Sequence, residues 1–170
     1  MGTKTGKIRV LFVCMGNICR SPTGEGVFKH FIDEHGLNDR FEIDSAGTIG
    51  HHTGASADSR MSAAARKRGY ELLSRARQVT VGDLAAFDLV IPMDHDNLAD
   101  LERLAGGPKD HIRLLGSYLS DTPDNHHAPS VPDPYYGGDA GFEEVLDMIE
   151  AACENILEHS LKLGLPPAAR

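Results

Sequence analysis

Residues 8–13 read Ile-Arg-Val-Leu-Phe-Val, a nearly continuous run of apolar and β-branched side chains. Such a run, with the length of one strand, is typical of a parallel strand buried on both faces. A polar loop follows at once, and from Ser21 apolar side chains recur at helical spacing until Gly36. This succession of strand, loop and helix favours an α/β fold.

Strands and helices continue to alternate along the chain. We expect, in order, a strand at 41–46, a helix at 59–68, a short helical turn opened by Thr80 and Asp83, a strand at 89–91, a helix through Leu98, Leu101 and Leu104, a strand at 111–115 and a helix at 142–161. The pattern predicts a three-layer domain in which helices cover both faces of a central four-stranded parallel sheet.

The length of 170 residues fits one hydrophobic core, so we expect one domain at 1–165 and a short tail at 166–170. The net charge of −8 disfavours a nucleic-acid partner, because binding a polyanion requires clustered Lys and Arg. No apolar run approaches the ~20 residues that cross a bilayer, and residues 1–4 lack an apolar signal core. We expect a cytoplasmic protein without membrane insertion.

The cysteines Cys14, Cys19 and Cys153 are too few for a disulfide scaffold, and we expect free thiols. They lack the spacing of zinc ligands, and the histidine pairs at 51–52 and 126–127 stand in loop-like sequence without cysteine neighbours. A structural zinc site is therefore not expected.

The loop after the first strand contains the most specific pattern in the chain, a Cys and an Arg separated by five residues between a strand and a helix. It comprises Cys14, Met15, Gly16, Asn17, Ile18, Cys19, Arg20 and Ser21. In parallel sheets, ligands bind at the carboxyl ends of strands. The backbone N–H groups of such a loop can form an anion nest backed by a helix N-terminus, so a phosphate group fits there.

The side chains of this loop suit phosphoryl transfer. A thiol at a helix N-terminus beside an arginine ionises readily, which makes Cys14 a candidate nucleophile. The planar fork of Arg20 can hold two phosphate oxygens. Gly16 and Asn17 tolerate left-handed backbone, and Ser21 can donate to the thiolate. An ordinary buried cysteine would leave the paired arginine without a role, and the Gly-Lys-Ser/Thr of a nucleotide-binding P-loop is absent.

The long loop at 117–138 supplies a candidate acid. A departing phenolate needs a proton, and Asp133 lies between two prolines that stiffen the backbone around it. Tyr135 and Tyr136 follow and can wall a slot for a flat aromatic ring. Asp-Pro alone is common turn chemistry, so the prediction depends on its combination with the Cys/Arg loop.

These motifs resemble the low-molecular-weight protein tyrosine phosphatase family over about residues 8–161. The similar segments are, in the same order, 13–22, 44–48, 76–79, 114–118 and 133–137. The resemblance implies hydrolysis of phosphotyrosine in proteins, with inorganic phosphate as product and without a metal or organic cofactor. It implies that Cys14 attacks phosphorus to form a phosphocysteine, that Arg20 clamps the phosphoryl group, and that Asp133 acts first as acid and then as base.

The resemblance also implies a substrate-binding set: Met15, Gly16, Asn17, Ile18, Cys19, Ser21, Tyr135 and Tyr136. Ser45 matches a supporting serine, and Cys19 resembles a redox guard that captures oxidised Cys14 as a disulfide. Two positions depart from some relatives. Ser74 stands where they have a histidine that supports the loop, and His51 stands where they often have an aromatic at the pocket rim.

Three other functions compete with this interpretation. Arsenate reduction on the same scaffold passes a disulfide to cysteines in the middle of the chain, and none occurs between Arg20 and Ala152. Phosphoarginine hydrolysis is known in bacterial relatives with Thr at the place of Ile18, whose apolar side chain better suits an aryl ring. A phosphopeptide-binding module without turnover would not need both Cys14 and Asp133.

Overall fold

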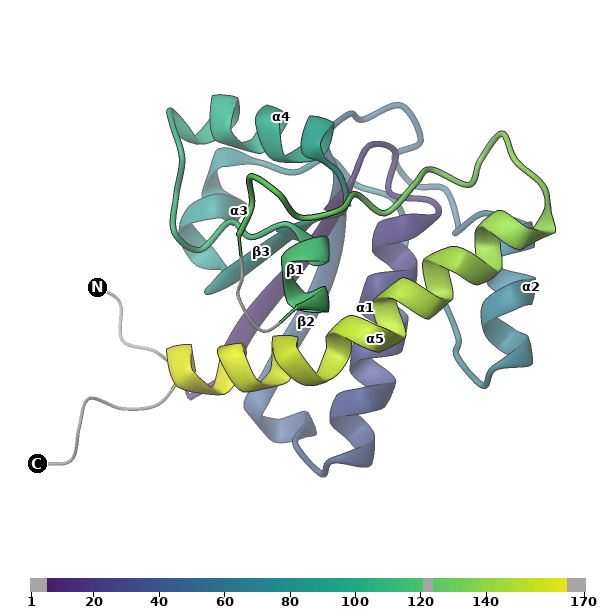
Figure 1. The fold of residues 1–170 in the computed structure, drawn as a ribbon, viewed down its shortest axis with the longest axis horizontal. Helices are drawn as coiled ribbons and strands as arrows, with labels where there is room; N and C mark the ends of the chain where they lie inside the picture. The colour runs from purple at the N-terminus through teal and green to yellow at the C-terminus, as the bar shows by residue number, and fades with distance from the viewer. Residues whose placement is uncertain (1–5, 121–123, 165–170) are drawn as a thin grey trace, which may run out of the picture.

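The first apolar run forms the central strand of a parallel sheet. In the computed structural model, which describes residues 6–120 and 124–164, β1 (Ile8–Cys14) lies between β2 (Phe41–Gly47) and β3 (Leu89–Pro92), as Figure 1 shows. Both neighbours run parallel to β1. All residues of β1 except Arg9 are buried, as expected for a strand with a neighbour on each side and helices on both faces.

Helices cover both faces of this sheet because successive side chains of a strand point to opposite faces. Phe12 belongs to the larger apolar cluster and Leu11 to the smaller one. The larger cluster is covered by α1 (Arg20–Glu34), α2 (Ser59–Lys67) and α5 (Asp139–Gly164), and the smaller one by α3 (Val81–Ala86) and α4 (His95–Ala105). The predicted α/β domain, with a parallel sheet between helices, is confirmed.

The predicted strand at 111–115 is wrong, and the sheet within the described residues has three strands rather than four. Ile112 makes one isolated bridge to Val90, flanked by two backbone hydrogen bonds of 2.9 Å. Pairing stops there because β3 ends at Pro92, which has no N–H to donate, and the chain turns into the 3₁₀ helix η2 (Leu115–Leu119). The apolar pattern reported the burial of Ile112 correctly, but burial does not require extended pairing.

Side-chain caps fix the starts of three helices near the carboxyl end of the sheet. Thr80 and Asp83 form the expected capping box of α3. Asp94, two residues beyond the end of β3, caps α4, and Asp58 caps α2. The 3₁₀ helix η1 (Asn38–Arg40) connects α1 to β2.

The last helix is slightly longer than the predicted 142–161, and the tail predicted at 166–170 lies outside the described residues. Within the described part of the chain, none of the helices combines the length and apolar character needed to cross a bilayer.

Candidate active site

The loop between β1 and α1 forms the floor of a pocket at the carboxyl end of the sheet. Asn17 has a φ of 58°, the left-handed backbone expected for this loop. The N–H of Thr48 donates to the carbonyl of Cys14 at 2.9 Å and ties the loop to the chain beyond β2. Gly47 permits this close approach, because a Cβ there would lie 2.7 Å from the carbonyl oxygen of Met15.

The sulfur of Cys14 is buried and surrounded by hydrogen-bond donors. The backbone N–H of Asn17 donates to Sγ at 3.3 Å, and the hydroxyl of Ser21 lies 3.0 Å from it. The side-chain amide of Asn17 donates to Ser21 at 2.7 Å and to Ser45 at 3.0 Å. The structure thus places two predicted loop residues, Asn17 and Ser21, beside the sulfur, where their hydrogen bonds can stabilise a thiolate, and Ser45 supports Asn17 from β2.

Arg20 is almost fully buried, with 3% of its side chain exposed, and an aspartate holds it in place. Its Nη1 donates to Asp94 Oδ2 at 2.6 Å and to the carbonyl of Val131 at 3.0 Å. Burial alone would lower the pKa of Arg20, but the charges of Cys14 and Asp94 and the hydrogen bond to Asp94 raise it, so the guanidinium stays charged.

Asp94 was missed in the sequence. Its signal was its position two residues beyond a buried strand, at the edge of the sheet where ligands bind.

Asp133 lies at the rim of the pocket on the side of Arg20. Its Oδ2 is 3.7 Å from Arg20 Nη2, and its Oδ1 accepts the N–H of Tyr135 at 3.1 Å. With 36% of its side chain exposed, it can exchange protons with solvent. The N–H of Val131 donates to the carbonyl of Met93 at 2.8 Å, so the loop is anchored beside β3 just before the acid.

Tyr135 and Tyr136 stand edge to face, with ring centroids 5.0 Å apart, at the mouth of the pocket. Arg60, from the first turn of α2, donates to the carbonyl of Tyr135 at 3.0 Å, and its guanidinium lies 5.3 Å from the Tyr135 ring. Asp58 in turn holds Arg60 with a contact of 3.1 Å. The sequence contained no local signal for this link, which joins residues 75 positions apart.

The pocket gathers most of the predicted site residues. Its lining consists of Cys14, Met15, Gly16, Ile18, Cys19, Arg20, His52, Asp133, Tyr135 and Tyr136. The predicted binding residues Asn17 and Ser21 lie behind the floor rather than on it. His52, and not the exposed His51, reaches the pocket, and its ring packs so closely on Gly16 that a Cβ there would lie 3.0 Å from it.

Cys19 is buried beside the pocket floor. Burial, followed by the charges of Asp58 and Cys14, raises the pKa of Cys19 to about 12. Burial likewise raises the pKa of Cys153 to about 12, and no disulfide joins the three cysteines. Cys19 and Cys153 are therefore protonated at neutral pH and are poor nucleophiles.

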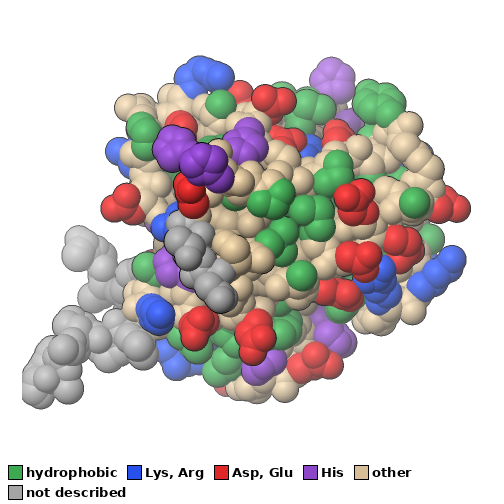
Figure 2. Space-filling view, in the orientation of Figure 1, with side chains coloured by type: hydrophobic (Ala, Val, Ile, Leu, Met, Phe, Trp, Pro, Cys, Tyr) green, Lys and Arg blue, Asp and Glu red, His purple; other side chains and the backbone are tan. Residues whose placement is uncertain are grey.

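On the face that Figure 2 shows, Asp and Glu side chains predominate over Lys and Arg, in line with the net charge of −8. Across 6–120 and 124–164, no three His, Cys, Asp or Glu side chains are grouped so that they could hold a metal ion.

The known proteins that this chain resembles in sequence and structure are phosphatases. A family model described as low molecular weight phosphotyrosine protein phosphatase matches residues 9–164. A low molecular weight protein-tyrosine-phosphatase of Streptomyces coelicolor is 46% identical over 151 residues, which are 88% of this chain and 91% of that one.

Solved structures agree with the sequence matches. A protein tyrosine phosphatase of Entamoeba histolytica is similar with a TM-score of 0.82 at 40% identity, over 94% of this chain and 100% of that one. A Drosophila arginine phosphatase has a TM-score of 0.79 at 32% identity, over 89% of this chain and 97% of that one.

Proposed function

The chain belongs to the low molecular weight phosphotyrosine protein phosphatase family, and from this premise we propose that Cys14, Arg20 and Asp133 hydrolyse phosphotyrosine monoesters through a phosphocysteine intermediate. The chain is thus a hydrolase of the protein-tyrosine-phosphatase class. The observation that carries the assignment of residues is their convergence in one pocket, where Arg20 Nη2 lies 3.7 Å from Asp133 Oδ2.

In the first step the thiolate of Cys14 attacks phosphorus in line. The S–P bond forms as the P–O bond to the tyrosine breaks, and Asp133 gives its proton to the departing phenolate oxygen. Arg20 and the N–H groups of the loop hold the equatorial oxygens, on which charge is concentrated in the transition state. The tyrosine leaves neutral, and Asp133 is left as a carboxylate.

In the second step water hydrolyses the phosphocysteine. The carboxylate of Asp133 takes a proton from the attacking water, a P–O bond forms, and the S–P bond breaks. Inorganic phosphate leaves, Cys14 returns as a thiolate and Asp133 is again protonated. One carboxyl group serves both steps because water enters where the phenolate left.

The walls of the pocket support an aromatic substrate. Ile18, Met15, Tyr135 and Tyr136 provide apolar and aromatic surface around the floor, which suits the ring of a phosphotyrosine side chain presented by a protein. The free thiols favour action in the cytoplasm, because a thiolate nucleophile needs a reducing compartment.

A second substrate is worth testing because the similar Drosophila protein is an arginine phosphatase. The apolar Ile18 on the pocket wall favours an aryl group over a guanidinium. Arsenate reduction lacks its relay, since no cysteine occurs between Arg20 and Ala152.

The test is phosphate release from phosphotyrosyl and phosphoarginyl peptides of matched sequence, in the presence of a chelator. The proposal expects turnover of the phosphotyrosyl peptide, none by Cys14→Ser, and slow turnover by Asp133→Ala. Preference for the phosphoarginyl peptide would replace the substrate but keep the nucleophile. Activity of Cys14→Ser equal to that of the parent would refute the mechanism.

A further inference from the structure

A buried carboxylate lies behind the phosphate loop and has no place in the two chemical steps. Glu25, one turn after Ser21 on α1, is only 6% exposed. Its Oε2 accepts from Lys29 at 2.7 Å, and its Oε1 accepts from the hydroxyl of Ser45 on β2 at 2.6 Å. Lys29 is half exposed and could pair with a carboxylate at the surface. Of the two contacts of Glu25, only the one to Ser45 therefore requires a buried position.

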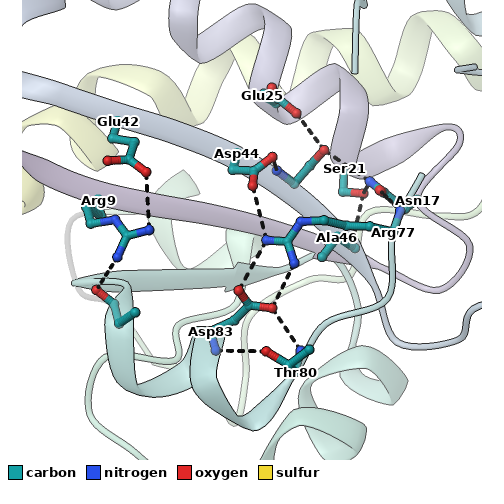
Figure 3. A network of polar contacts seen from close by, with 12 residues as sticks. Arg9, Asn17, Ser21, Glu25, Glu42, Asp44, Ala46, Arg77, Thr80 and Asp83 are labelled. Atoms are coloured by element: carbon teal, nitrogen blue, oxygen red, sulfur yellow. Dashed lines mark hydrogen bonds and ion pairs between the residues drawn. The ribbon is translucent and has the colours of Figure 1, made fainter. Parts of the chain in front are cut away.

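Ser45 connects Glu25 to Asn17, whose side-chain orientation is fixed by its neighbours. The backbone N–H of Arg77 donates to Asn17 Oδ1 at 3.0 Å, so the NH2 end of the Asn17 side chain must point away from Arg77. Arg77 is itself held by ion pairs to Asp83 and Asp44, at 2.9 and 3.1 Å. Figure 3 shows Arg77 between these carboxylates and Glu25 directed toward the cluster of Asn17 and Ser21.

The carboxylate sets the direction of the remaining hydrogen bonds. A carboxylate accepts and does not donate, so Ser45 must give its single proton to Glu25 and accept from Asn17. Asn17 also donates to Ser21 at 2.7 Å, so the hydroxyl proton of Ser21 must point elsewhere. Two acceptors are in reach, the Cys14 sulfur at 3.0 Å and the Ala46 carbonyl at 3.3 Å. A thiolate is charged and closer, so it receives the proton.

We propose that Glu25 is a positioning residue for the reaction: through Ser45, and together with the N–H of Arg77, it holds Asn17 in the orientation in which Ser21 donates to the Cys14 thiolate. This inference rests on the proposed function, which makes Cys14 the nucleophile. Glu25 touches neither substrate nor sulfur. Its effect passes through groups that are almost fully buried, where water cannot replace a lost donor.

Electrostatics alone and the loss of the hydrogen-bond chain predict opposite changes in the ionisation of Cys14 when Glu25 is replaced. Removing a negative charge near the site would by itself ease ionisation of Cys14. Losing the directional chain of hydrogen bonds makes ionisation harder. Glu25→Gln keeps the shape of the side chain, but its amide can donate to Ser45 and reverse the first hydrogen bond.

The experiment measures the pH midpoint of Cys14 alkylation by iodoacetamide, with no substrate present. Cys19 and Cys153 do not interfere, because burial raises the pKa of each to about 12. We expect the midpoint to rise by about one pH unit in Glu25→Gln, the size expected when a hydrogen bond to a charged group is lost. At pH values below both midpoints, where the thiolate fraction limits the rate, the kcat/KM for phosphotyrosine should fall about tenfold with it.

Glu71→Gln is the matched control, because Glu71 lines the same small cavity as Glu25 and Lys29 but is exposed. Its midpoint should equal that of the parent. The charged and titratable groups that line the pocket with Cys14 remain in every variant; they are Cys19, Arg20, His52, Asp133, Tyr135 and Tyr136.

Ser45→Ala should raise the midpoint as Glu25→Gln does, and the double variant should add nothing. A fall, an unchanged midpoint or additive effects would overturn the inference. Should Glu25→Gln not fold, Ser45→Ala decides, and the absence of a rise there overturns it. Because alkylation requires no turnover, failure of the parent to hydrolyse phosphotyrosine would refute the proposed function separately.

Discussion

The substitution Asp94→Asn isolates the contact that holds Arg20 over the phosphate site. Asp94 Oδ2 accepts from Arg20 at 2.6 Å, whereas Oδ1 accepts the N–H of Asn97 at 2.7 Å and caps α4. Asparagine keeps an oxygen for the cap but turns an amide donor toward the guanidinium. The substitution therefore breaks the link to Arg20 and preserves the helix start.

The expected cost follows from the burial of the two partners. Removing one member of a buried ion pair costs about 3–5 kcal/mol. The Asp94 side chain is 21% exposed, and the Val131 carbonyl still accepts from Arg20. We therefore expect a loss of about 2 kcal/mol in the free energy of unfolding. For a chain of this size the loss corresponds to a fall in Tm of about 4–8 °C.

The assay is thermal unfolding with and without inorganic phosphate, together with kcat/KM for an aryl phosphate. Phosphate should raise the Tm of the parent more than that of Asp94→Asn, because a misplaced Arg20 binds it less well. The kcat/KM should fall at least about tenfold. Asp96→Asn, at an exposed position in the same helical turn, should stay within about 0.5 kcal/mol of the parent. If the two variants are equally stable and active, the role of Asp94 is wrong.

Three further predictions follow from the site and its surroundings. Arg60→Ala frees the loop that carries Asp133, so kcat should fall about tenfold for poor leaving groups and little for activated aryl phosphates; equal losses on both would contradict this. Burial alone would raise the pKa of Asp83, but its hydrogen bonds to Arg77 and Thr80 outweigh burial and lower the pKa below 3.8. The ionised Asp83 therefore stabilises the fold fully above that value, and this stabilisation is lost as pH falls through the lower folded-state pKa. Asp83→Asn should therefore reduce the acid-induced drop in Tm, and an unchanged drop would count against it. After peroxide, Cys19→Ser should recover less activity under thiol than the parent if Cys19 captures oxidised Cys14; full recovery would exclude this protection.

The sequence predicted what neighbouring residues encode together. The strand, the Cys/Arg loop and the following helix are contiguous, so apolar periodicity and residue chemistry were enough to place Cys14 and Arg20. Asp133 was predicted from its prolines and from the chemical need for an acid. The fourth strand failed for the same local reason, because an apolar pattern reports that Ile112 is buried and not how many residues pair with β3.

Contacts that depend on tertiary structure could not be read from the sequence. Asp94 is 74 positions from Arg20, and Glu25 reaches Ser45 only because α1 packs on β2. An acidic residue on a helix is ordinary in a sequence, and its burial becomes evident only in the folded chain. The backbone path of the loop decides that His52 rather than His51 reaches the pocket. Two adjacent histidines in a sequence give no indication of that path.

The covalent intermediate is the most direct test of the account. The Asp133→Ala protein should be mixed with an activated aryl phosphate and quenched in acid during turnover. After proteolytic digestion, the mass of the peptide containing Cys14 should be measured by mass spectrometry. An activated leaving group needs no acid, whereas hydrolysis of the intermediate still needs the base, so phosphocysteine should accumulate. We expect one phosphoryl group on Cys14 and none in Cys14→Ser. Turnover without a phosphorylated Cys14, or a phosphoryl group on another residue, would contradict the mechanism.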